Sequence, residues 1–295
     1  MKKIILSIAT MAFYAAYAYE GPIPIGNFAL PTALQPSPLF SFGQNILDAH
    51  DALAYINPVY LKGKNKKSFT NLLYFIYGLT DSTSIFALVP VPTINKENGQ
   101  QMSGFGDVII QGEYAYINSS TPTTLTQATI VGSIYLPSGE FEIEKQLPAL
   151  PDHLPFLGSG STSFFLGGTF DHTTINWYSF ASAGGFFTRT RKNNKIGNNF
   201  LYQLGLGRNI SHLNDQILLL LFEFDGIYIK RNILMGQKDI NSGGNVIYFG
   251  PVLYYANKWL IFQAGIQAPI YQKLNGTQQK NSYTFSMSVA WFFNR

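Results

Sequence analysis

The hydrophobic pattern is clearest near the C-terminus, between Ser282 and Phe293. Apolar side chains occupy one parity of this stretch, and small side chains occupy the other, apart from Phe292. The apolar set is Tyr283, Phe285, Met287, Val289, Trp291 and Phe293, and the small set is Thr284, Ser286, Ser288 and Ala290. A period of two predicts a β-strand whose two faces meet different surroundings. Aromatic residues opposite small hydroxyls are typical of a strand between lipid and a lumen.

Similar segments recur along the chain and predict its fold class. We predict twelve strands, at residues 47–61, 68–79, 83–92, 105–117, 125–137, 161–172, 176–190, 200–210, 217–231, 245–256, 259–271 and 282–293. The connections alternate between longer and shorter ones, and the longer ones are 62–67, 93–104, 138–160, 191–199, 232–244 and 272–281. Outer-membrane barrels show this alternation, with short periplasmic turns and longer external loops. The sequence therefore predicts an all-β protein, a transmembrane up-and-down antiparallel β-barrel of about 12 strands.

Composition agrees with a membrane barrel. Charged residues make up 12% of the chain and aromatic residues 15%, whereas ordinary soluble domains carry about 25% charged residues. The chain has no cysteine, which excludes disulfides and thiolate metal sites. The net charge of +4 comes from basic residues divided between separate loops, so nucleic acid is not an expected partner.

The N-terminus predicts export. Lys2 and Lys3 precede an apolar run from Ile4 to Ala16, and Ala18 completes a small-x-small cleavage site. We predict a cleaved signal peptide at 1–18 and a location in the outer membrane of a Gram-negative cell. A proline-rich N-terminal arm follows at 19–43, and the barrel is expected at 44–295. Five prolines prevent regular structure in the arm, which could be a periplasmic tether or a plug inside the lumen.

Four acidic residues lie on the polar parity of predicted strands. They are Asp107, Glu113, Glu223 and Asp225. Because a charge facing lipid is costly, we expect these carboxylates to line the lumen. They could form a structural network by pairing with Arg189 or Arg208, or they could make a polar constriction along a solute path.

The remaining candidate chemistry is weak. His50, His153, His172 and His212 lie in separate segments without the spacing of metal ligands, so no metal site is expected. Asp171 and His172 are adjacent and should point to opposite faces of a strand, which prevents a catalytic dyad. We therefore expect neither an enzyme nor a cofactor site. Gly104 begins a G-F-G-D stretch that opens a strand, where its glycines would permit a bend.

Several motifs, in order, carry a family resemblance. They are N-L-L-Y-F-I-Y-G-L-T-D-S-T-S-I from Asn71, G-F-G-D-V-I-I-Q-G-E-Y from Gly104, L-P-S-G from Leu136, L-G-S-G-S from Leu157 and the closing aromatic strand. Together they resemble the outer-membrane barrels grouped as the MetA-pathway phenol-degradation family. The resemblance implies a barrel that passes small hydrophobic or aromatic molecules. The chain departs from the usual outer-membrane C-terminus because Asn294 and Arg295 follow the last aromatic residue.

These observations lead to one functional hypothesis and two alternatives. The first is passive uptake of small hydrophobic or aromatic compounds, with capture in the long connection 138–160. The alternatives are a non-transporting surface or adhesion scaffold and an outer-membrane enzyme. The expected partners are outer-membrane lipid and lipopolysaccharide, the barrel-assembly machinery and a small hydrophobic solute. The basic residues expected to face lipopolysaccharide lie in two long connections and are Lys62, Lys64, Lys66, Lys67, Arg191, Lys192 and Lys195.

Overall fold

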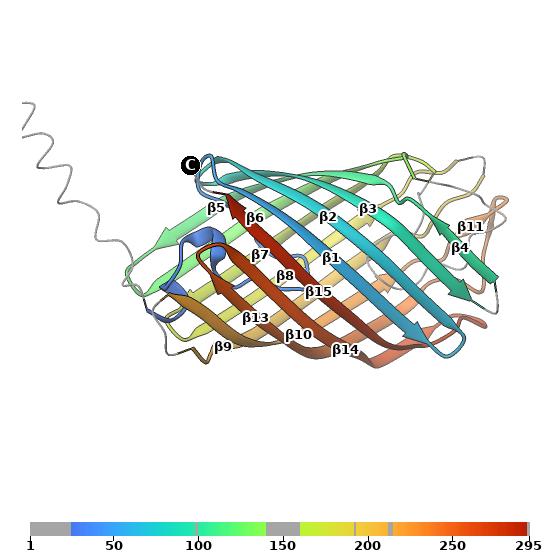
Figure 1. The fold of residues 1–295 in the computed structure, drawn as a ribbon. Coiled ribbons are helices and arrows are strands. Elements are labelled where there is room, and N and C mark those ends of the chain that lie inside the picture. The colour runs from blue at the N-terminus through green and yellow to red at the C-terminus, as the bar shows by residue number, and fades with distance from the viewer. Residues whose placement is uncertain (1–24, 98–99, 140–159, 192, 212–214, 294–295) are drawn as a thin grey trace, which may run out of the picture.

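Within residues 25–97, 100–139, 160–191, 193–211 and 215–293, which the computed structural model describes, twelve long strands close into a barrel (Figure 1). Their bounds are β1 Ala52–Gly63, β2 Lys66–Thr80, β3 Thr83–Glu97, β5 Val108–Ser120, β6 Thr124–Leu136, β7 Ser163–Thr174, β8 Trp177–Phe187, β9 Asn199–Asn209, β10 Gln216–Ile229, β13 Gly244–Asn257, β14 Leu260–Leu274 and β15 Asn281–Phe293. Neighbouring strands pair antiparallel, and β15 pairs with β1 to close the sheet. Closure pairs both edges of the sheet, which satisfies the backbone in lipid. The predicted fold class is confirmed.

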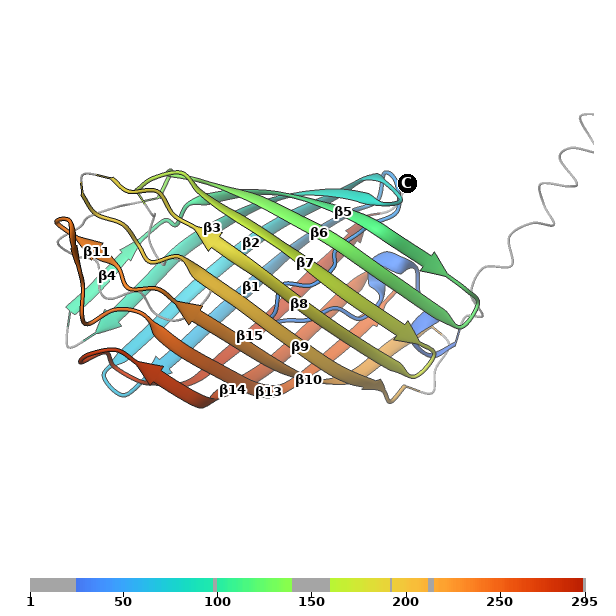
Figure 2. The same ribbon diagram turned by 180° about the vertical axis from the view of Figure 1, so that it is seen from behind.

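Short elements extend the two ends of the barrel. β4 (Gln100–Gly104) pairs with the distal part of β3, and β11 (Ile233–Leu234) pairs with β12 (Gln237–Lys238). Two 3-10 helices, η1 (Gly26–Phe28) and η2 (Thr32–Leu34), precede the first strand. In the described ranges, no helix is both long enough and apolar enough to span a membrane. Figure 2 shows the far wall, where β5 to β9 run side by side.

All twelve predicted strands are present, but two boundaries differ in an informative way. The first strand begins at Ala52 rather than at residue 47. Residues before Ala52 bond instead to side chains inside the lumen. The Leu47 amide, for example, donates to the Ser84 hydroxyl at 2.9 Å. The predicted long connection 62–67 is wrong, since β1 and β2 extend to Gly63 and Lys66 and leave only two residues between them. Lys62 and Lys67 lie opposite each other in this extended hairpin.

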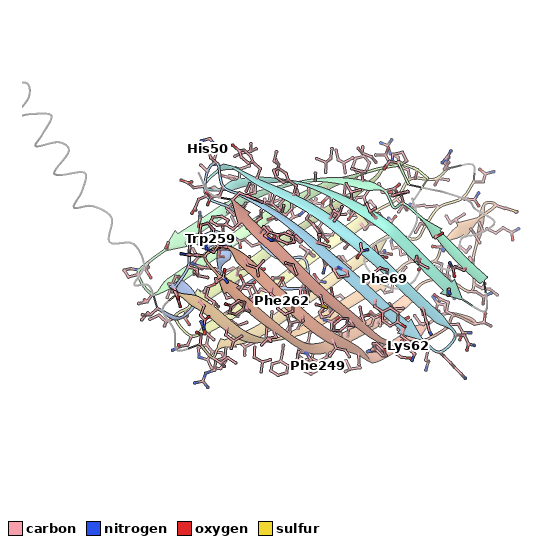
Figure 3. The ribbon with its side chains drawn as sticks, in the orientation of Figure 1. His50, Lys62, Phe69, Phe249, Trp259 and Phe262 are labelled. Carbon is pink, nitrogen blue, oxygen red and sulfur yellow. The ribbon has the colours of Figure 1, made fainter. Side chains whose placement is uncertain are left out.

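The two faces of the wall have opposite character. In β15, Phe285, Trp291 and Phe293 are exposed, whereas Thr284 and Ser286 are buried. Outward aromatic side chains also pack on one another, as Phe224 and Phe249 do with ring centroids 4.4 Å apart. Figure 3 shows Phe249 projecting from the outer surface of the barrel, with Trp259 and Lys62 near opposite ends. An apolar aromatic exterior fits a surrounding of lipid, so the large exposed hydrophobic side chains need no protein partner.

The lipid-facing wall yields a depth-dependent prediction. Leu204 is 54% exposed near the middle of β9, and Ile210 is 47% exposed just beyond its end. We expect Leu204→Arg to destabilise the barrel, lowering its free energy of unfolding in vesicles by about 2–4 kcal/mol. Ile210→Arg should lower the free energy of unfolding by only about 0–1 kcal/mol. Urea titration in phosphatidylcholine vesicles measures both values. Equal effects of the two variants would contradict the assigned lipid face.

Candidate functional site: the lumen and its N-terminal arm

The N-terminal arm from residue 25 onward lies inside the barrel rather than beside it. Figure 1 shows this segment within the barrel, at the end where β15 finishes. The Asn27 side chain donates to the Thr174 carbonyl at 3.0 Å, near the turn between β7 and β8. Further along, the Tyr254 hydroxyl donates to the Leu34 carbonyl at 2.8 Å. The arm therefore enters along one wall, held by backbone and side-chain bonds.

The arm then turns back inside the lumen. Phe42 packs edge-on against Phe165 of β7, with ring centroids 5.0 Å apart. The return segment reaches the opposite wall, where the Asn45 amide donates to Glu113 of β5 at 2.9 Å. Gly43 permits the reversal, because a Cβ there would lie 2.4 Å from the rigid ring of Pro38. The arm is thus a U-shaped segment with its apex near Phe42.

Glu223 is the main anchor of the apex. Its carboxylate accepts hydrogen bonds from three consecutive backbone amides, those of Leu39 at 2.8 Å, Phe40 at 3.2 Å and Ser41 at 3.0 Å. The Ser41 hydroxyl lies 3.0 Å from the same carboxylate. An irregular backbone has no neighbouring strand whose carbonyls could accept hydrogen bonds from its amides. The buried carboxylate takes the place of those carbonyls.

Asp225 completes the anchoring of the apex. Asp225 lies two residues along β10 from Glu223, on the same inward face, and is 2.5 Å from the Ser41 hydroxyl. Gln203 donates to Asp225 at 2.9 Å, and Gln267 also donates to it. Gln203 in turn accepts from the Phe42 amide at 3.1 Å. One hydrogen-bond network therefore joins the apex to β9, β10 and β14.

The predicted arginine partners lie elsewhere. Arg208 and Arg189 are exposed, and their guanidinium groups lie over the rings of Trp177 at 5.4 Å and Phe164 at 5.3 Å. Both basic residues are directed away from the inward face that carries the acids. Among the described residues, every hydrogen-bond donor to Glu113, Glu223 and Asp225 is a neutral group. The alternative in which the acids pair with these arginines is wrong, because the carboxylates bind the arm.

Asp107 differs from the other three predicted lumen residues. It is buried, but it precedes β5 rather than lying within a strand. Its carboxylate accepts from the Gly139 amide at 3.0 Å, just beyond the distal end of β6. The structure therefore brings Glu113, Glu223 and Asp225 together around the arm and places Asp107 at the rim.

A cavity of about 320 Å³ remains beside the arm. Much of its wall is apolar or aromatic, and these residues include Leu72, Leu88, Ile109, Tyr135, Phe165, Phe186 and Leu201. Three hydroxyls that also line it, those of Ser68, Thr70 and Thr284, have no hydrogen-bond partner within the part of the chain that the structure describes. The cavity wall is thus more apolar than polar, although polar side chains such as Gln111, Asn199 and Gln267 line it from several strands.

Of the other sequence candidates, Asp171 lines the cavity, whereas His172 does not. Asp171 is buried and accepts from the Tyr178 hydroxyl at 2.7 Å, whereas the His172 ring bonds to Thr126 on the other face. The prediction that these neighbours face opposite ways is confirmed. His153, His212 and residues 140–159 of the predicted capture connection lie outside the described residues, as do the signal peptide and residues 19–24 of the arm.

Sequence analysis missed the residues that bind the apex from both sides. Gln203 and Gln267 stand on the inward parity of their strands, which was a usable signal for lumen-facing amides. Ser41 gave no such signal, because it lies in an arm without periodicity. The plug hypothesis describes where residues 25–43 lie, and the tether hypothesis does not.

Comparison with known proteins supports the fold. No family model matches the sequence, and no curated protein matches it significantly. The structure is similar to that of an outer membrane channel from Pseudomonas putida F1, with a TM-score of 0.65, 11% identity and coverage of 88% of this chain and 99% of that chain. The NanC porin gives a TM-score of 0.49 and 10% identity over 81% of this chain and 98% of that chain. The similarity to the Pseudomonas putida F1 channel shows that the chain has the barrel fold that the family resemblance implied.

The Glu223 anchor yields a prediction about the arm. Glu223→Ala leaves three backbone amides without an acceptor, at a cost of about 1–3 kcal/mol for each buried group, whereas the Ser41 hydroxyl keeps Asp225 as its acceptor. We expect the apex to leave its place while the barrel still assembles, which would raise single-channel conductance in planar bilayers. Asp171→Asn is the control, because this buried acid lines the same cavity but bonds to Tyr178 of the wall and not to the arm. Failure of Glu223→Ala to assemble would assign the residue a purely structural role.

Proposed function

We propose that this barrel allows passive uptake of small hydrophobic or aromatic compounds. The observation that carries the proposal is the cavity of about 320 Å³ with a largely apolar wall, enclosed by the barrel and the arm. Small-molecule sites commonly measure about 300–1,000 Å³, and an apolar cavity of about 150 Å³ already accommodates benzene. The lumen is therefore large enough for a solute of one or two rings.

The chemistry of the wall selects against charged solutes. A charged molecule entering this part of the lumen would lose its hydration. The described carboxylates of β5 and β10 could not replace that hydration, because they already accept hydrogen bonds from the arm. An uncharged aromatic molecule would instead replace water beside Phe165 and Tyr135. A polar substituent on such a solute could bond to the Thr70 or Thr284 hydroxyl. These features favour small, weakly polar compounds and down-gradient flow, with no cofactor.

The position of the arm makes the pathway a gated one. The arm occupies the lumen on the side of the turns, and the cavity is lined by the arm between Thr32 and Leu47. Movement of the apex would therefore widen the route along the barrel axis. The similar barrel from Pseudomonas putida F1 is described as an outer membrane channel, which favours transport over a purely structural role.

Export and membrane contacts complete the proposal. Residues 1–18 would be removed as a signal peptide, and the barrel-assembly machinery would insert the barrel into the outer membrane. Exposed Lys62, Lys64 and Lys67 at the distal end would contact lipopolysaccharide phosphates, whereas Lys66 is buried and faces inward. The first three lysines are therefore the better candidates for that contact.

A scaffold without transport is the second candidate. It is favoured by the filled lumen, because the arm and the side chains it contacts occupy much of the interior. An outer-membrane enzyme is a weaker candidate, because His172 and Asp171 face opposite sides of β7. Transport and scaffold hypotheses differ in one measurable respect, the flux of solute through an assembled barrel.

Uptake in whole cells tests the proposal. Labelled toluene, a labelled fatty acid and a labelled sugar are supplied to cells with and without the protein. Cells expressing it should take up an apolar class faster, and Glu223→Ala should raise uptake further because the apex no longer closes the lumen. Heat-modifiable gel mobility verifies equal amounts of folded barrel. No difference for any solute at equal barrel levels would support the scaffold hypothesis.

A further inference from the structure

One row of inward-facing side chains crosses four neighbouring strands beside the cavity. Tyr74 of β2 stands opposite Leu88 of β3. Leu88 in turn stands opposite Ile109 of β5, and Ile109 stands opposite Tyr135 of β6. All four side chains line the cavity. The row therefore places two aliphatic side chains between two tyrosines at one level of the wall.

Both tyrosine rings are held in place by an aromatic neighbour. Tyr74 stacks on Tyr55 of β1, with ring centroids 4.2 Å apart and an interplanar angle of 12°. Tyr135 packs edge-on against Phe186 of β8, with centroids 4.7 Å apart and the two planes at 75°. A ring that is held by a neighbour keeps its orientation when a solute contacts it, so little conformational entropy is lost on binding.

The spacing of the strands leaves room for one more ring between the two tyrosines. Neighbouring strands lie about 4.8 Å apart, so three intervals place the two tyrosine backbones roughly 14 Å apart along the wall. A ring between two others, at the usual centroid distance of about 4.5–7 Å on each side, needs about 9–14 Å. Because the wall curves around the lumen, the inward side chains converge, which brings the two rings into this range. Leu88 and Ile109 form the apolar floor of this recess, which we call the tyrosine slot.

The two hydroxyls of the tyrosine slot differ from the polar groups around them. Across the part of the chain that the structure describes, the hydroxyls of Tyr74 and Tyr135 make no hydrogen bond. The Gln111 side chain, by contrast, donates to Glu113 at 2.8 Å and accepts from the Ser133 hydroxyl at 2.7 Å. A phenol hydroxyl in apolar surroundings needs an acceptor, because a donor left unpaired there is costly. The slot therefore offers two hydrogen-bond donors to a solute that lies over its floor.

We propose that the tyrosine slot binds small uncharged aromatic carbonyl compounds, such as aryl ketones and aldehydes. The ring packs between Tyr74 and Tyr135, and the carbonyl oxygen accepts a hydrogen bond from one of their hydroxyls. A carbonyl group also withdraws electrons from its ring, which strengthens packing against the electron-rich faces of tyrosine. A hydrocarbon of the same size fits the slot but leaves both hydroxyls unpaired. The slot thus ranks carbonyl compounds above hydrocarbons.

The slot also discriminates against the corresponding acids. An aromatic carboxylate would lose its hydration in apolar surroundings. It would also meet the carboxyl groups of Glu113 and Asp171, which are buried at inward positions of β5 and β7. Among the described residues, no lysine, arginine or histidine lines the cavity to offset these costs. An uncharged carbonyl compound avoids both of them.

The tyrosine slot deepens the proposed function and rests on it, because it names the solutes that the barrel passes most readily. At low solute concentration the rate of uptake follows the occupancy of a binding site along the path. Solutes that bind in the slot should therefore compete with one another for uptake.

Competition for uptake tests the slot. Cells with and without the full-length protein receive labelled ethylbenzene, and unlabelled acetophenone or benzoate is added at increasing concentration. The variant that combines Tyr74→Phe with Tyr135→Phe removes both hydroxyls and keeps both rings. Tyr178→Phe is the matched control, because the Tyr178 hydroxyl belongs to the same cavity wall but already donates to Asp171 at 2.7 Å. Heat-modifiable gel mobility verifies equal amounts of folded barrel.

We expect the acetophenone concentration that halves ethylbenzene uptake to rise about 2–10-fold in the combined variant, the loss expected for one uncharged hydrogen bond. Tyr178→Phe should leave this concentration unchanged, and benzoate should inhibit the natural protein far less than acetophenone does. An unchanged value in the combined variant, or inhibition by benzoate as strong as that by acetophenone, would overturn the slot. Absence of barrel-dependent uptake of labelled ethylbenzene and of labelled acetophenone would instead overturn the proposed function, so the two failures are distinguishable.

Discussion

Hydrogen bonding of the backbone in lipid is the constraint from which the rest of this structure follows. Hydrocarbon offers no partner to an amide or a carbonyl, so a wall made of strands must close on itself. The pairing of β1 with β15 achieves this closure and creates an interior. Once the interior exists, each strand must present one kind of side chain to lipid and another to the lumen. The parity of β15, with Phe285 and Trp291 outward and Ser286 inward, is the direct consequence.

The same constraint explains how the arm is held. The arm has too many prolines to form a strand, so its amides enter the lumen without a ladder. Glu223 accepts three of these amides, Glu113 accepts one from Asn45, and Gln203 accepts that of Phe42. Buried carboxylates normally need a cation, but here the amides, a hydroxyl and side-chain amides supply the donors. The acids and the arm thus satisfy each other, which couples the position of the arm to the barrel wall.

Function emerges where these arrangements leave space. The arm occupies part of the lumen and leaves a cavity beside it whose wall is more apolar than polar. A barrel that served only as a scaffold would have no need for such a cavity. The cavity therefore favours the proposed movement of small apolar molecules over support of an external structure.

The sequence by itself determined the strands, their inward and outward faces and the lumen position of Glu113, Glu223 and Asp225, because a period of two is a local property of the chain. Parity also contained the evidence against Arg208 as their partner, since it lies on the outward set of β9. Only the tertiary structure decided that the arm folds into the lumen and that Ser41 joins Glu223 to Asp225. An irregular segment has no periodicity to reveal its path, and its contacts across 182 and 184 residues join parts of the chain that only the closed barrel brings together.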